Sequence, residues 1–123
     1  MKELTKAEDQ IMQVLWQLEK GFVKDIIERL PEPKPAYNTV STIVRILETK
    51  GFVNHKAYGK THEYFPIIAK EKYQQFYINN MVRGYFNGSF ASLVSFFAKE
   101  NQMNVNELDE LVKQLEEMKN KKS

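Results

Sequence analysis

The chain has 123 residues, a formal net charge of +2 and no cysteine. Its length allows one domain, or one small domain with an appendage, and the lack of cysteine excludes disulfides, thiolate metal sites and cysteine nucleophiles. The opening segment has no apolar run typical of a signal peptide, and the longest uncharged stretch, residues 84–98, is too short to span a bilayer. We therefore expect a cytoplasmic protein that does not insert into a membrane.

The first thirty residues carry the signals of two helices. Thr5 and Glu8 have the spacing of a capping box, in which two side chains satisfy the unpaired N–H groups of a helix start. Apolar residues then recur at helical spacing, which predicts a helix from about Lys6 to Glu19. Gly21 ends this helix, and a short second helix follows before the prolines of residues 31–35 exclude further helix.

Residues 38–50 form the third predicted helix, and its two faces differ. One face carries apolar side chains at three- and four-residue spacing, namely Val40, Ile43, Val44 and Leu47. The opposite face carries short polar groups and one cation, namely Asn38, Ser41, Thr42, Arg45 and Thr49. Ser, Thr and Asn are poorer helix formers than the Glu and Lys of an ordinary solvated face, so this face is expected to serve a function.

A β-hairpin is predicted next, over residues 52–66. Two short segments with strand character flank a turn at Tyr58, Gly59 and Lys60, and Pro66 closes the second segment. Three helices followed by a two-stranded hairpin is a winged helix-turn-helix, which we assign to residues 1–66. The fold class is therefore mainly α with one small β-hairpin.

The rest of the chain, residues 67–123, has a purely helical pattern and predicts three further helices. It carries eight of the fifteen aromatic residues, more apolar surface than so small a unit can bury by itself. Identical chains are the commonest partners, so we expect a helical dimerisation domain. The expected contact residues lie on the apolar helical faces: Tyr73, Phe76, Tyr77, Phe90, Leu93, Val94, Phe97, Leu108, Leu111 and Leu115.

Positive charge is concentrated around the third helix and the hairpin. Residues 34–62 hold five lysines and arginines against a single acid, a net charge of +4. A cationic patch on a helix-turn-helix is typical of a protein that binds double-stranded DNA, and short polar side chains let a helix approach base edges closely. The expected DNA-binding residues are Tyr37, Asn38, Thr39, Ser41, Thr42, Arg45, Lys34, Lys50, Lys56, Lys60 and His62.

Other interpretations of single residues stay open at this point. Asn38 or Thr39 could cap the third helix, Arg45 could pair within its helix with Glu48 or Thr49, and the hairpin lysines could serve solubility alone. His55 and His62 could face each other as a metal pair, and the aromatic stripe at residues 73–77 could enclose a ligand. No catalytic arrangement, phosphate-binding glycine loop or metal-ligand spacing is present in the sequence, so we expect no enzyme, cofactor or metal.

The chain resembles the penicillinase and methicillin-resistance repressors, the BlaI/MecI family, over nearly its full length. The resemblance rests on "LTKAEDQIMQVLW", on "NTVSTIVRILETKGFVNHK", on "YFP" at the end of the hairpin and on "GSFASLVSFFAKE" in the helical part. It implies a homodimeric transcriptional repressor that binds palindromic operators of resistance operons through its N-terminal heads. Its helical tails would interlock to form the dimer.

Induction in that family is implied to proceed through a membrane sensor and proteolytic cleavage within the tail. The family cleaves between an Asn and a Phe shortly after "SLV", which places Phe96 at the position of the Asn and Phe97 at that of the Phe. This departure argues against the usual protease and its β-lactam signal, although the segment Ser95–Phe97 remains the expected joint. Copper sensing, which a related branch performs with cysteines, is disfavoured here.

Two further classes of function remain open. The protein could be a regulator that binds an aromatic small molecule in the dimer groove, or a protein-interaction module built on a winged helix.

Overall fold

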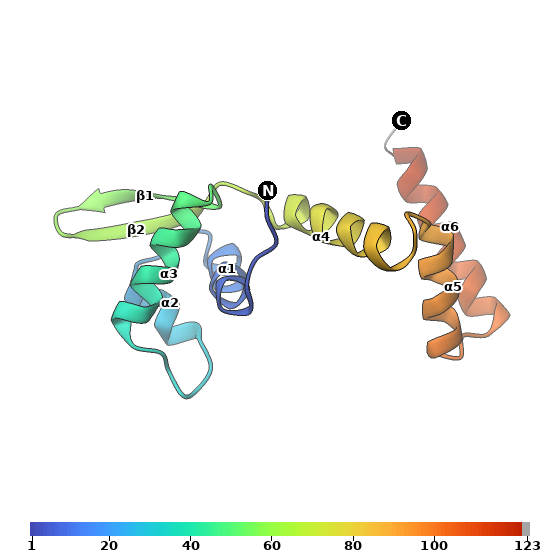
Figure 1. The fold of residues 1–123 in the computed structure, drawn as a ribbon, viewed down its shortest axis with the longest axis horizontal. Coiled ribbons are helices and arrows are strands. Elements are labelled where there is room, and N and C mark those ends of the chain that lie inside the picture. Colours follow the sequence, from blue (N-terminus) through green and yellow to red (C-terminus); the bar gives the residue numbers. More distant parts are fainter. Residues whose placement is uncertain (122–123) are drawn as a thin grey trace. The chain divides into compact units, whose positions relative to one another are not determined.

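The computed structural model describes residues 1–121 and is mainly helical with one hairpin, which confirms the predicted fold class (Figure 1). Its elements are, in chain order, α1 (Lys6–Leu18), α2 (Val23–Arg29), α3 (Tyr37–Thr49), β1 (Val53–Tyr58), β2 (Thr61–Pro66), α4 (Lys70–Tyr85), α5 (Phe90–Glu100) and α6 (Val105–Lys121). The chain divides into two units, Met1–Tyr77, here called the head, and a second unit that begins at Ile78, here called the tail.

Local capping fixes the ends of the head helices. The Glu8 N–H donates to the Thr5 hydroxyl at 3.2 Å, and the Thr5 N–H donates to the Glu8 carboxylate at 2.9 Å, which is the predicted capping box of α1. At the end of α3, Gly51 has a φ of 83°, a left-handed conformation that glycine adopts without a Cβ penalty. The Phe52 N–H then donates to the Leu47 carbonyl at 2.9 Å, and the chain turns into β1.

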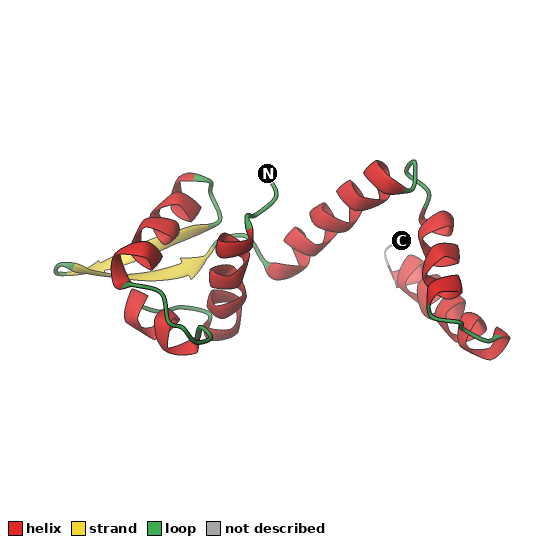
Figure 2. Cartoon of the chain, turned by 60° about the horizontal axis from the view of Figure 1, so that its bottom comes forward, coloured by secondary structure: helices red, strands yellow, loops and turns green. Residues whose placement is uncertain are grey.

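The hairpin is antiparallel, with His55 opposite Tyr64 and Tyr58 opposite Thr61 across a tight turn. Gly59 in this turn has a φ of 64°, which again suits glycine. The segment between α1 and α2 adds a β-bridge to the hairpin, because Gly21 and Tyr64 exchange N–H···O hydrogen bonds of 2.9 and 2.8 Å. The hairpin is thereby attached to the helices, as Figures 1 and 2 illustrate.

The core of the head is one cluster of fourteen buried hydrophobic residues. It includes Met12, Leu15, Ile26, Val40, Val44 and Leu47, each with 0% exposure, so α1, α2 and α3 pack with their apolar faces together. Burial of such side chains provides most of the driving force for folding, about 1.5–3 kcal/mol for each large one.

The first half of α4 belongs to the head, so the units divide at 77/78 rather than at the expected boundary of 66/67. Tyr73 is only 7% exposed, its ring lies 5.8 Å from that of Phe52, and its hydroxyl accepts a 2.8 Å hydrogen bond from the Leu4 N–H. The Trp16 indole donates to the Ile68 carbonyl at 2.9 Å. Phe76 is partly buried and also packs against the head core, so Tyr73 and Phe76 contribute to the packing of the head.

The tail buries far fewer of its side chains. Among its described residues only Val82 and Ala98 are buried, although α5 and α6 have well-formed starts. The Ser89 hydroxyl caps α5 by accepting from the Ser92 N–H at 3.1 Å, and the predicted cap of α6 is present, with the Glu107 N–H donating to the Asn104 side chain at 2.9 Å. None of the helices within residues 1–121 combines the length and apolar character needed to cross a membrane.

Candidate nucleic-acid interface

The N-terminal half of α3 presents an exposed polar face. Tyr37 is 53% exposed, and Asn38, Thr39 and Thr42 are exposed as well. The N-cap of α3 is Ala36, which makes no side-chain capping bond, so neither Asn38 nor Thr39 caps the helix. These side chains are therefore available for recognition.

Two residues of the predicted polar face behave differently from the others. Ser41 is only 9% exposed and lies at the edge of the helix that faces the hairpin. The Thr42 hydroxyl donates its hydrogen to the Asn38 carbonyl at 2.8 Å, which leaves its oxygen able to accept hydrogen bonds. Ser41 is thus part of the helix packing, whereas Thr42 keeps an outward surface.

Arg45 does not form the intrahelical pairs that the sequence allowed. The Thr49 hydroxyl bonds the Arg45 backbone carbonyl at 3.1 Å rather than its guanidinium group. Glu48 instead approaches His55 of the hairpin. The exposed Arg45 side chain lies on the side of α3 that faces the hairpin.

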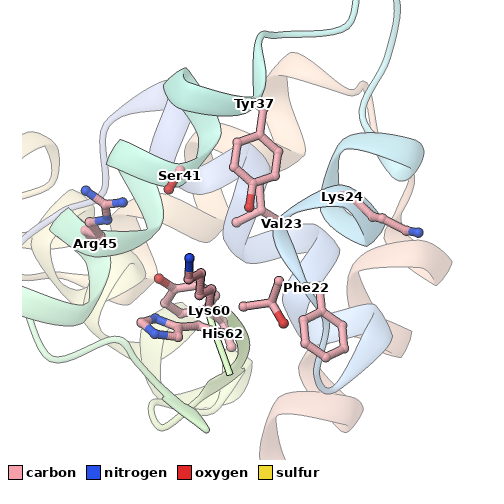
Figure 3. Close-up of a pocket in the computed structure, with 10 residues that line it drawn as sticks. Phe22, Val23, Lys24, Tyr37, Ser41, Arg45, Lys60 and His62 are labelled. Carbon is pink, nitrogen blue, oxygen red and sulfur yellow. The ribbon is translucent and has the colours of Figure 1, made fainter. Parts of the chain in front are cut away.

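A cleft of about 560 Å³ lies between the start of α2, the N-terminal half of α3 and strand β2 (Figure 3). Three of the ten residues that line it are cations and none is acidic. In Figure 3, Tyr37 and Ser41 lie on one side of the cleft and His62 and Lys60 on the other, with Arg45 at one end and Lys24 at the opposite end. A concave surface with several cations and no acid attracts polyanions.

Tyr64 also lines this cleft. It is 4% exposed, and burial raises the pKa of its phenol above the ordinary value. The Glu48 carboxylate acts in the same direction, while the Arg45 guanidinium partly opposes both. The phenol therefore remains protonated and neutral at physiological pH, so it adds no negative charge to the cleft.

The hairpin carries two lysines on exposed backbone. Lys56 lies with its Nζ 5.3 Å from the centre of the Tyr58 ring, and that ring packs at 5.8 Å from Phe22 at the start of α2. Lys60 follows Gly59 in the turn and lines the cleft. Both ammonium groups are exposed, so both can approach a polyanion.

Lys34 and Lys50 have structural partners. The Lys34 ammonium donates to the carbonyls of Ile27, Glu28 and Leu30 at 2.8–3.1 Å, where it caps the C-terminus of α2. The Lys50 ammonium lies 2.8 Å from the Glu8 carboxylate and joins the end of α3 to the start of α1. The sequence pattern counted both charges in the cationic patch, but backbone carbonyls bind the Lys34 ammonium and the Glu8 carboxylate pairs with that of Lys50.

Sequence reasoning missed Lys24 and Phe22, which line the cleft from the start of α2, and the contact between Glu48 and His55. A basic residue at the start of the second helix was the available signal for Lys24. The Glu48–His55 contact joins residues of two different elements, so periodicity gave no signal for it. The two histidines stack on each other, and His55 Nδ1 faces a carboxylate oxygen.

The residues expected at the dimer surface and at the cleavage point divide into two groups. Outside the head, the exposed ones are Phe90 (53%), Phe97 (51%) and Leu115 (43%), whereas Leu93, Val94, Leu108 and Leu111 are half-buried. Tyr77, the last residue of the head, is 49% exposed. Phe96 is 55% exposed, and its ring packs on that of Phe86 at 5.7 Å. Met118, part of the predicted last apolar stripe, lies outside the residues whose side chains are described.

A family model and individual relatives both place the chain among the penicillinase repressors. Residues 4–117 match the family model of the penicillinase repressor. The penicillinase repressor of Bacillus licheniformis is 28% identical over 121 residues, which cover 98% of this chain and 94% of the relative. The methicillin resistance regulatory protein MecI of Staphylococcus aureus (strain N315) is 26% identical over 110 residues, 89% of each chain.

A solved structure agrees with the fold of the head. The solution structure of the DNA-binding domain of the repressor BlaI superposes with a TM-score of 0.50 at 27% sequence identity. The match covers 59% of this chain and 94% of that domain. The winged helix-turn-helix described above is thus the DNA-binding domain, and the chain belongs to the penicillinase repressor family, a family of DNA-binding transcriptional repressors that are not enzymes.

Proposed function

We propose that the chain acts as a homodimer that represses its target genes by occupying a palindromic operator. Each head inserts the N-terminal half of α3 into the major groove and lays the hairpin along the DNA backbone. The observation that carries this proposal is the exposed polar face of α3 beside a cleft that is lined by three cations and no acid. A recognition helix in a helix-turn-helix protein reads bases with its N-terminal residues.

The side chains divide into base-reading and backbone-binding groups. The base-reading group comprises four exposed residues of α3: Asn38, Thr39, Thr42 and Arg45. All four side chains can form hydrogen bonds with base edges. Lys24, Lys56 and Lys60 surround that face and would bind phosphates, which positions the protein without reading sequence. We leave Lys34 and Lys50 out of the interface because their ammonium groups have partners within the head.

The tail is the part that dimerises in this proposal. It exposes several large apolar side chains: Ile78, Tyr85, Phe90, Phe96, Phe97, Val105, Val112 and Leu115. So many exposed apolar groups on a short segment favour a partner surface, and a closed twofold dimer suits a palindromic site. A dimer also gains affinity because the second head binds at a high effective concentration.

Release from DNA would follow from cutting the tail at Phe96–Phe97. This bond lies inside α5, where the Phe97 carbonyl accepts hydrogen bonds from the backbone and the side chain of Asn101 at 3.1 and 2.8 Å. A protease needs this turn to open locally first. Cleavage would separate α6 from the head and weaken the dimer, so an inducer-activated protease or membrane sensor is the expected partner.

The relatives suggest which genes are controlled. One is named for penicillinase and the other for methicillin resistance, so we propose that the targets are antibiotic-resistance genes. The departure at Phe96 suggests that the protease, and with it the inducing signal, differs from that of the family.

A labelled inverted repeat from the DNA upstream of the chain's own gene tests the repressor proposal. We expect two chains per duplex, a preference over a scrambled duplex of equal length, and affinity that falls steeply with added salt because phosphate binding releases counterions. Equal binding to both duplexes at physiological salt would show that the protein does not recognise a specific operator.

Mass spectrometry of the protein recovered from cells under cell-wall antibiotic stress tests the release step. Fragments that end near Phe96 would support cleavage. An intact chain together with full derepression would contradict it and would point to a ligand in the dimer groove.

A further inference from the structure

The chain's two histidines lie against each other on one face of the hairpin. Their ring centres are 4.1 Å apart, and the ring planes differ by 9°. His55 stands on β1 opposite Tyr64, while His62 stands on β2 opposite Ala57, so the two are diagonal neighbours across the antiparallel pair. No other side chain of this sequence is an imidazole, which makes the stack a separately observable group.

Glu48 of α3 holds one end of this stack. Its Oε1 lies 2.5 Å from Nδ1 of His55. A ring nitrogen that faces a carboxylate oxygen carries the hydrogen, so the Nδ1–H of His55 donates and the orientation of the ring is fixed. The contact joins the hairpin to the recognition helix, and both side chains are only partly exposed, at 27% and 36%.

His62 is the other end of the stack and lines the cleft together with Arg45 and Lys60. Figure 3 shows its ring beside Lys60, on the side of the cleft opposite Tyr37. Glu48 therefore fixes His55, His55 supports the flat face of His62, and His62 faces the place where we expect the DNA backbone.

We propose that Glu48 and His55 are positioning residues for His62, and that His62 binds a phosphate of the operator backbone as an imidazolium ion. Operator binding then takes up one proton. The inference rests on the proposed function, because it needs the cleft to face DNA.

The charges around His62 support this direction. The groups that face it are Lys24 from α2, Tyr37, Arg45 and Glu48 from α3, His55 from β1, Lys60 from the turn and Tyr64 from β2. Before DNA binds, cations surround the cleft and the one carboxylate lies behind His55. An arriving phosphate brings negative charge to the cleft and favours the charged ring over the neutral one.

One proton is expected rather than two. A second charge on His55 would place two like charges 4.1 Å apart, which repel each other. Histidine changes charge between about pH 5 and pH 8, so the uptake falls in an accessible range.

Operator affinity measured by fluorescence anisotropy from about pH 6 to about pH 8.5 at constant ionic strength tests the proposal with the full chain. We expect the affinity to rise as pH falls, by up to about tenfold per pH unit where one proton is taken up. His62→Gln should weaken binding at low pH and flatten the profile. His62→Lys, which keeps a permanent cation, should bind tightly at both ends with a flat profile.

The positioning role has its own variants. Glu48→Gln and His55→Gln keep His62 but remove its support, so we expect a shallower pH profile while binding at high pH stays near that of the parent. NMR of the two imidazole signals follows the same step directly, and one of them should become protonated at higher pH in the operator complex than in the free chain. Circular dichroism of each variant confirms folding.

The outcomes separate the inference from the proposed function. Tight operator binding with no pH dependence, or a pH profile that His62→Gln leaves unchanged, overturns the proton uptake and leaves the repressor intact. Glu48→Gln and His55→Gln profiles identical to the parent overturn the positioning role. Failure to bind the operator at any pH overturns the proposed function itself.

Discussion

In the head, fourteen hydrophobic side chains are buried in one cluster, whereas among the described residues of the tail only Val82 and Ala98 are buried. Both parts have regular helices with good caps, so the difference lies in packing and not in local structure. Capping and helical periodicity are satisfied within a helix, but an apolar face needs something to cover it. The head covers most of its own apolar side chains, while the tail leaves many of its large apolar side chains exposed.

Truncation after Tyr77, which removes the tail, should have the largest effect on operator affinity. The head should still fold, because its core is complete, and its unfolding midpoint should not depend on concentration. Its affinity for the full operator should fall by about a hundredfold to ten-thousandfold, since the two heads are no longer linked. Anisotropy and chemical denaturation measure the two quantities.

A fragment of residues 1–77 that stays unfolded would contradict the claim that the head is self-sufficient. A folded fragment that binds the operator as tightly as the full chain would instead contradict the role of the tail.

Truncating one large apolar side chain in each unit should show that the two units are stabilised differently. Leu47→Ala in the head removes a side chain with 0% exposure and should lower the free energy of unfolding by about 2–5 kcal/mol at any protein concentration. Phe97→Ala in the tail removes a side chain that is 51% exposed, so its effect should appear in dimer dissociation, by more than about 1 kcal/mol if it lies at the centre of the interface.

Denaturation at several concentrations distinguishes the two cases. We expect Phe97→Ala to lower the unfolding midpoint most at low protein concentration, where the weakened dimer dissociates. If Phe97→Ala instead lowers the midpoint equally at every protein concentration, Phe97 stabilises the single chain and not the dimer.

Within the head, the interface should respond more to Arg45 than to an arginine elsewhere. Arg45→Ala should weaken specific operator binding by about 1–3 kcal/mol if the guanidinium contacts a base edge. Arg29→Ala is the matched control, because Arg29 is exposed at the end of α2 and does not line the cleft. Equal losses for the two variants would indicate general charge attraction without base reading by α3.

The smallest expected effect concerns the ion pair between Glu8 and Lys50. Burial alone would raise the pKa of Glu8, but the hydrogen bond from Lys50 and those from Thr5 hold it below the ordinary value. Because the folded-state pKa is lowered, the pair stabilises the protein above about pH 4.3, the ordinary value for Glu, and this contribution is lost as pH falls through the folded-state pKa. Lys50→Met should lower stability by about 1 kcal/mol at neutral pH, since the Lys50 side chain is 31% exposed and the pair is partly screened by solvent.

Thermal unfolding from about pH 3 to pH 7 measures this loss, and operator binding supplies the second readout. We expect Lys50→Met to bind the operator like the parent once folded, whereas Lys60→Ala should bind any DNA more weakly. If both variants lost DNA affinity equally, Lys50 would belong to the DNA-binding surface.

The sequence predicted those features of the fold that depend on neighbouring residues. The capping pair Thr5 and Glu8, the proline-rich break and the turn at Gly59 are local signals, and the structure confirms the helices and hairpin that they indicate. The alternation of apolar and polar residues also identified the buried face of α3.

Features that depend on the approach of distant elements were beyond the sequence pattern. Lys50 and Glu8 are 42 residues apart, and only the packing of α3 against α1 brings their charges together. Likewise, the aromatic spacing of α4 could not reveal that Tyr73 and Phe76 pack against the head, since periodicity defines a face but not what covers it. Ser41 looked like its exposed neighbours in the sequence, but it is only 9% exposed and lines the cleft between α3 and the hairpin.

Sedimentation equilibrium of the full chain over a wide range of concentration tests the contrast between the two units most directly. We predict a reversible dimer with twice the 14.5 kDa chain mass at micromolar concentration, because the apolar faces of the tail need a partner. A folded chain that remains at the mass of a single chain across the whole range, with its tail helices intact by circular dichroism, would contradict the account.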